Sequence, residues 1–105
     1  MAVKILRRTR AARDAEAIAD YIGKQSLEAA VRFLLQTEAT IEYLAEFPGK
    51  GGRFISDIPA LSRLRVWRVK GFPNHLIFYI EHPAAIEIVR ILHGAMDLEA
   101  ELRDS

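Results

Sequence analysis

Apolar residues recur at three- and four-residue spacing through the first half of the chain, which is the pattern of amphipathic helices. We predict a first helix over about residues 10–22, with Thr9 as its N-cap and Gly23 just past its C-terminus. A second helix follows, with Ser26 as its N-cap, and Pro48 ends its apolar pattern. The short connection predicts an antiparallel hairpin whose apolar stripes face one core. These stripes are Ala11, Ala15, Ile18 and Ile22, and Leu27, Ala30, Phe33, Leu34, Thr37, Ile41, Leu44 and Ala45.

The second half of the chain is rich in β-branched and aromatic residues, which favour strands. A short apolar run at Val3–Leu6 also predicts a strand ahead of the first helix. Turn signals at Gly71–Asn74 and His82–Ala84 are short enough to join antiparallel neighbours. The order predicts an α+β fold, with an N-terminal strand and a helix hairpin before three antiparallel strands, in a single domain over residues 1–105. The three later strands are predicted at Leu64–Val69, His75–Ile80 and Ile86–Leu92.

The formal net charge of +1 conceals a segregation of charge along the chain. Residues 1–13 and 50–70 are basic, with Asp57 as the single acid in either segment, whereas residues 14–46 are mostly acidic. If the two basic segments meet in space, they form a cationic face, which suits nucleic acid or a protein that handles it. The basic side chains are Lys4, Arg7, Arg8, Arg10, Arg13, Lys50, Arg53, Arg63, Arg65, Arg68 and Lys70.

The sequence contains no cysteine, which excludes a disulfide framework, a cysteine zinc site and a thiol nucleophile. Its histidines, His75, His82 and His93, do not have the spacing of zinc ligands, so we expect neither a metal nor a cofactor. No segment has the composition of a signal peptide or a membrane span, and we therefore expect a cytoplasmic protein.

Two branched apolar residues of the second helix fall outside its core stripe. Val31 and Leu35 lie roughly 100° to 140° around an ideal helix from Ala30. They share this face with Glu38 and Glu42. Exposed branched residues here indicate either a docking strip for a partner or the scattered apolar residues that most protein surfaces carry.

Four motifs stand out, two at the ends of the predicted helices and two that cover the predicted strands. They are Ile18–Ile22, Phe47–Gly49, Leu64–Val69, and the pair Asn74–Tyr79 with Ile88–Gly94. In this order and spacing they resemble the RelE/ParE superfamily of toxins, and the ParE branch in particular, over nearly the whole chain. One departure is Met96, where that family often has a basic residue.

The resemblance implies the toxin component of a type II toxin–antitoxin or plasmid-stabilisation system, neutralised by a cognate antitoxin in a hetero-oligomer. For the ParE branch it implies inhibition of DNA gyrase by binding, which needs no catalytic chemistry. The candidate target-binding residues are Arg63, Arg65, Arg68, Arg90 and His93. The candidate antitoxin-binding residues are Val31, Leu35, Glu38 and Glu42.

The alternative is a RelE-like activity, the metal-independent cleavage of messenger RNA on the ribosome. Such an enzyme requires an acid or base, together with cations for the phosphorane-like charge, and Arg65, Arg90 and His93 are the candidates. Only part of the required set is present, so we expect a binding inhibitor rather than an enzyme. Two structural alternatives stay open for these residues. His93 is then part of the scaffold, and Arg90 is then the ion-pair partner of Glu87 or another acid. A degenerate toxin that only binds its antitoxin is a third possibility.

Overall fold

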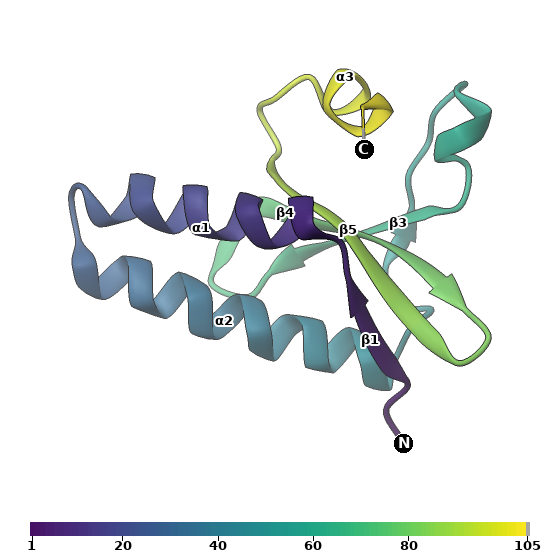
Figure 1. Cartoon of the computed structure of the whole chain (residues 1–105), viewed down its shortest axis with the longest axis horizontal. Helices are drawn as coiled ribbons and strands as arrows, with labels where there is room; N and C mark the ends of the chain where they lie inside the picture. The colour runs from purple at the N-terminus through teal and green to yellow at the C-terminus, as the bar shows by residue number, and fades with distance from the viewer. Residues whose placement is uncertain (105) are drawn as a thin grey trace.

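The chain folds as a mixed five-stranded sheet with a helix hairpin on one face (Figure 1). The computed structural model describes residues 1–104. The strands have the order β1-β5-β4-β3-β2. None of the helices within residues 1–104 has the length and the hydropathy of a membrane span. The elements are β1 (Lys4–Arg7), α1 (Thr9–Gly23), α2 (Leu27–Glu46), β2 (Gly52–Arg53), the 3-10 helix η1 (Pro59–Leu61), β3 (Leu64–Val69), β4 (Phe72–His82), β5 (Ala85–His93) and α3 (Leu98–Arg103).

The predicted α+β fold and its order of a strand, two helices and three later strands are confirmed. The sheet is mixed rather than antiparallel throughout, because β1 runs parallel to β5. Three short elements were not predicted, namely β2, η1 and α3. The strand expected from His75 begins at Phe72, and Gly71, with φ of +80°, forms the tight turn before it.

The helix ends agree with the predictions only in part. Ser26 is the N-cap of α2, and its hydroxyl accepts a hydrogen bond from Ala29 N at 3.1 Å. The prediction that Thr9 caps α1 is wrong, because Thr9 is already helical and Arg8 occupies the cap position without a side-chain bond. Gly23 is the last residue of α1 rather than the residue after it, and Lys24 follows in the right-handed conformation.

Both faces of the sheet are buried. The hairpin covers one face, where Phe33, Ile41 and Leu44 pack against the inward side chains of β4 and β5. The opposite face is covered by α3 and the segment that contains η1, through Leu61 and Leu102. Two predicted core residues of α2 are exposed instead, Leu27 at 76% and Leu34 at 41%, because they lie on the flank of the buried stripe.

Candidate partner-binding surfaces

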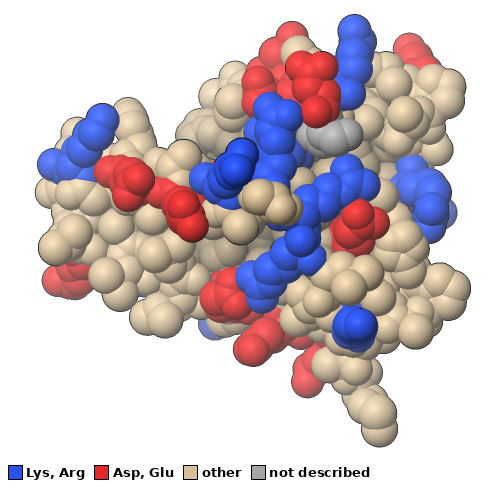
Figure 2. All heavy atoms as spheres, in the orientation of Figure 1, with Lys and Arg blue, Asp and Glu red and all other residues tan. Residues whose placement is uncertain are grey.

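An apolar strip runs along the exposed flank of α2. Its members follow the i, i+4, i+7, i+8 spacing of one helix face: Leu27, Val31, Leu34 and Leu35. Val31 is 54% exposed and Leu35 is 66% exposed. Uncharged residues also cover most of the hairpin surface at the left of Figure 2. These four residues, here called the α2 strip, form a contiguous apolar surface rather than scattered positions.

The α2 strip ends at the two predicted glutamates. Glu38 receives two hydrogen bonds from the guanidinium of Arg7, one of them at 2.8 Å. This bonding raises the pKa of Arg7, and the nearby charge of Glu42 adds to the effect. Glu42 is exposed. The strip therefore carries net negative charge at its C-terminal end, since only Glu38 is neutralised by a direct ion pair.

The three predicted arginines of the β3 region do not form one cluster. Arg65 lies on the face that the hairpin covers, where it donates to Gly51 O at 2.7 Å and pairs with Glu81 at 3.3 Å. Arg63 is exposed and reaches Glu81 O at 3.4 Å. Arg68 is exposed and makes no ion pair within residues 1–104, which leaves its charge open to a partner.

Arg90 is a buried ion-pair residue. Its side chain is 4% exposed, and its guanidinium donates to the Asp14 carboxylate at 2.7 and 3.0 Å and to Glu101 at 3.3 Å. The bond to Asp14 is the main cause of its raised pKa. Glu87, the partner considered from sequence, pairs with Arg8 and His82 instead. The geometry therefore joins β5 to α1 and α3 and leaves little of Arg90 for a target.

His93 is the last residue of β5, and it lies beside His75 of the neighbouring strand β4, with ring centroids 5.1 Å apart. Its Nδ1 accepts a hydrogen bond from Ala95 N at 3.0 Å, which places the proton of the neutral ring on Nε2. Arg65 is in register with Tyr79 and Ile88. At about 3.3 Å per residue, Ile88 and His93 are roughly 16 Å apart along β5, so Arg65 and His93 do not share one site.

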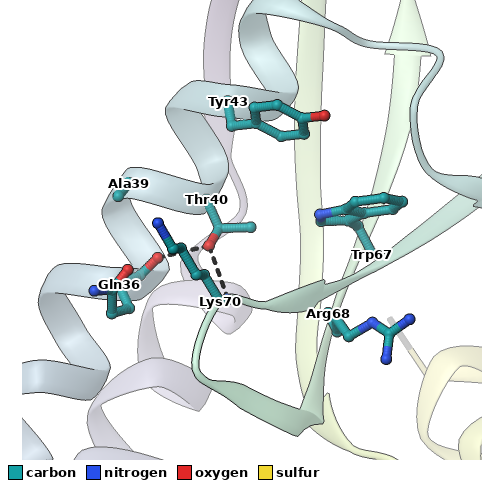
Figure 3. Close-up of a pocket in the computed structure, with 7 residues that line it drawn as sticks. All are labelled: Gln36, Ala39, Thr40, Tyr43, Trp67, Arg68 and Lys70. Carbon is teal, nitrogen blue, oxygen red and sulfur yellow. Dashed lines mark hydrogen bonds between the residues drawn. The ribbon is translucent and has the colours of Figure 1, made fainter.

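A groove between α2 and β3 was not found from the sequence (Figure 3). Its volume is about 450 Å³, and the indole of Trp67 stacks on Tyr43 along one wall with ring centroids 6.2 Å apart. Periodicity identified the buried face of each element, but a groove between two elements depends on how far apart they pack. The lining residues are Gln36, Ala39, Thr40, Tyr43, Trp67, Arg68 and Lys70.

Within residues 1–104 no group of three or more histidine, cysteine, aspartate or glutamate side chains could hold a metal ion. The surface features described above are the α2 strip, the groove, and the cations of β3.

Comparisons with known proteins agree with this architecture. The model of the ParE toxin of the type II toxin–antitoxin system parDE matches residues 5–98. The fold is similar to a chain of the chromosomal ParDE toxin–antitoxin system from P. aeruginosa, with a TM-score of 0.69 and 20% identity, over 87% of this chain and 95% of that chain. No match was found among curated protein sequences. Because the family match covers most of its length, the chain belongs to the ParE toxin family of type II toxin–antitoxin systems.

Proposed function

We propose that this toxin is neutralised by a cognate antitoxin that docks on the α2 strip, and that the free toxin inhibits DNA gyrase by binding. The exposed α2 strip is the observation that supports docking of the antitoxin on this helix. Val31 and Leu35 are more than half exposed on a helix whose other face is fully buried. An amphipathic segment with apolar side chains at matching spacing would remove both from water. Glu42 favours a partner segment with basic residues at that end.

The gyrase part is supported by family membership and by the scattered positions of the candidate catalytic residues. Arg90 is buried, and Arg65 and His93 lie far apart along the sheet. Inhibition by binding requires only a complementary surface. We assign that surface to the cations along β3, with Arg68, which is exposed and makes no ion pair within residues 1–104, as its main member and Arg63 and Arg65 farther along the strand. His93 is a more distant contact, and Arg90 supports the scaffold.

Controlled expression of the chain in a bacterial host tests this proposal. We expect growth arrest with altered DNA supercoiling while translation continues, and we expect co-expressed antitoxin to restore growth. Prompt arrest of translation with cleaved messenger RNA would replace gyrase inhibition with ribosome-dependent cleavage. Antitoxin binding without any effect on growth, or on purified gyrase, would identify a toxin that has lost its activity.

A further inference from the structure

A hydrogen bond between the turn after β3 and α2 fixes one end of the groove between these two elements. Thr40 is buried, and its hydroxyl accepts from Lys70 N at 3.1 Å and donates to Gln36 O at 2.7 Å. The bond from Lys70 N attaches the turn after β3 to α2, whereas the bond to Gln36 O lies within the helix, and Figure 3 draws both as dashed lines. The cavity therefore exists before any partner arrives, and binding pays little reorganisation energy.

The lining of the groove combines apolar surface with positive charge. Trp67, Tyr43 and Ala39 provide the apolar walls, and Lys70 provides a cation, whereas the guanidinium of Arg68 points away from α2 (Figure 3). Among residues 1–104 no carboxylate lines the groove. Tyr43 is 37% exposed, and the neighbouring ring of Phe47 extends the aromatic surface past it at a centroid distance of 5.3 Å. A large apolar side chain flanked by carboxylates complements this lining in both shape and charge.

The outer edge of β3 beside the groove is open. The short strand β2 pairs only with Arg65 and Val66, so no strand of the described chain covers Trp67–Val69 on that side. A second hollow of about 290 Å³ lies at the same edge, lined by Trp67, Arg68 and residues of the opposite face. Successive side chains of an extended peptide point to opposite faces of a sheet, so neighbouring residues of one segment can enter the two hollows.

These features favour an extended peptide over a single nucleic-acid strand. The available cations are few, and the indole of Trp67 is already stacked on Tyr43 rather than free for a base. An open strand edge offers backbone N–H and C=O groups, which a peptide can pair with and a nucleic acid does not match.

We propose that the α2–β3 groove binds an extended acidic segment of the antitoxin, with one large apolar side chain against Trp67 and carboxylates at Lys70 and Arg68. This inference rests on the proposed function. It adds a mechanism of neutralisation, because the same segment would cover Arg68, the exposed cation of the surface assigned to the target that makes no ion pair within residues 1–104. The antitoxin would then exclude the target directly.

Trp67 is the single tryptophan of the chain, so its fluorescence reports on the groove without a label. The probes are synthetic peptides with a central leucine flanked by aspartate and glutamate, and matched peptides with lysine flanks or with serine in place of leucine. We expect the acidic leucine peptide to change the emission of Trp67 and to bind at least about tenfold more tightly than either control, with an affinity that decreases as salt increases. Equal binding of all three peptides would overturn the proposal.

Blocking the groove tests the location. Ala39→Arg places a long side chain over the groove from an exposed helix position, and Ala17→Arg on α1 is the matched control. We expect Ala39→Arg to abolish peptide binding while Ala17→Arg leaves it unchanged. Binding that survives Ala39→Arg, or preferential binding of an oligothymidylate over the acidic peptide, would exclude the groove as a peptide site.

The cognate antitoxin separates this inference from the proposed function. If the inference holds, Ala39→Arg weakens antitoxin binding by about tenfold or more, and Ala17→Arg does not. Unchanged antitoxin affinity in Ala39→Arg would reject the groove and leave neutralisation at the α2 strip intact. Failure of the unmodified toxin to bind the antitoxin would instead reject the proposed function itself.

Discussion

At the scale of single residues, His75 is the least satisfied polar side chain of the described fold. Its Nδ1 is buried and has no hydrogen-bond partner within residues 1–104. Its ring lies between Phe33 and His93, at centroid distances of 5.2 and 5.1 Å, and Arg32 lies over the adjacent Phe72. The charged groups around His75 are therefore positive. Burial lowers the pKa of His75 below the usual histidine value of 6.5, and the charge of His93 lowers it further.

This shift predicts that the toxin is less stable in mild acid. Above pH 6.5 His75 is neutral in both the folded and the unfolded state. As the pH falls below that value, the unfolded state binds the proton first, and the free energy of unfolding decreases. Because the ring is partly accessible to solvent, we expect the midpoint of thermal unfolding to decrease by only on the order of 2 °C between about pH 7 and pH 5.

The matched variant is His75→Phe, which keeps an aromatic ring beside Phe33 and removes the titration. Differential scanning calorimetry of both proteins across this range should show a shallower pH dependence for the variant. Parallel curves for the two proteins would show that groups other than His75 control the pH dependence of stability.

At the scale of elements, α2 carries both of the proposed antitoxin-binding surfaces. Its core stripe faces the sheet, the α2 strip lies on one flank, and the groove lies on the other. Val31→Lys combined with Leu35→Lys removes the apolar character of the strip and keeps good helix formers at exposed positions. We expect the affinity for the antitoxin to decrease by about 100-fold, because truncated apolar anchors typically cost several kcal/mol together.

Ile55→Lys is the control for this double variant, since Ile55 is 91% exposed and lies outside the strip. Isothermal titration calorimetry with the antitoxin should show native affinity for the control and the large decrease for the double variant. Thermal stability should stay within about 2 °C of the original protein for both. Native antitoxin affinity in the double variant would contradict docking on the strip.

The sequence allowed prediction of those elements whose signal is local. The periodicity of α1 and α2 and the β-rich runs after Pro48 predicted the hairpin and the three later strands, and the Ser26 cap followed from residue type. The parallel pairing of β1 with β5 has no local signal, because its partners lie far apart in the sequence. The six-residue α3 is too short for a clear period. For Arg90 the sequence left both target binding and pairing with an acid open, and it did not point to Asp14, which is 76 positions away.

At the scale of the whole molecule, the surfaces proposed for antitoxin binding and for target binding differ in charge and in shape. The hairpin surface is apolar and acidic, whereas the β3 edge is cationic, and α2 separates the two surfaces. An antitoxin that reaches both surfaces with one chain gains effective concentration for its second contact, so two modest contacts give tight neutralisation. In the proposed function the target contacts only the cationic side. Covering that side is therefore sufficient for inhibition of the toxin.

A buried ion-pair network holds the frame that presents these surfaces. Beyond the end of β1, the outer edge of β5 is paired by a side chain, because the Asp14 carboxylate accepts from Ile91 N at 3.0 Å. The same carboxylate holds Arg90, which also reaches Glu101 of α3. Three elements distant in the sequence thus meet at Arg90.

Asp14→Asn should therefore destabilise the whole fold. The change removes the charge that balances Arg90, and breaking a buried pair on one side typically costs ~3 kcal/mol. Chemical denaturation should show a loss of this size, whereas Asp20→Asn, at an exposed position of the same helix, should unfold as the original protein does. Combining Asp14→Leu with Arg90→Met removes both charges of the buried pair, and we expect it to recover part of the loss because the Glu101 carboxylate that loses Arg90 is 35% exposed to solvent. If Asp14→Asn were as stable as Asp20→Asn, the ion-pair network would not contribute to the free energy of unfolding.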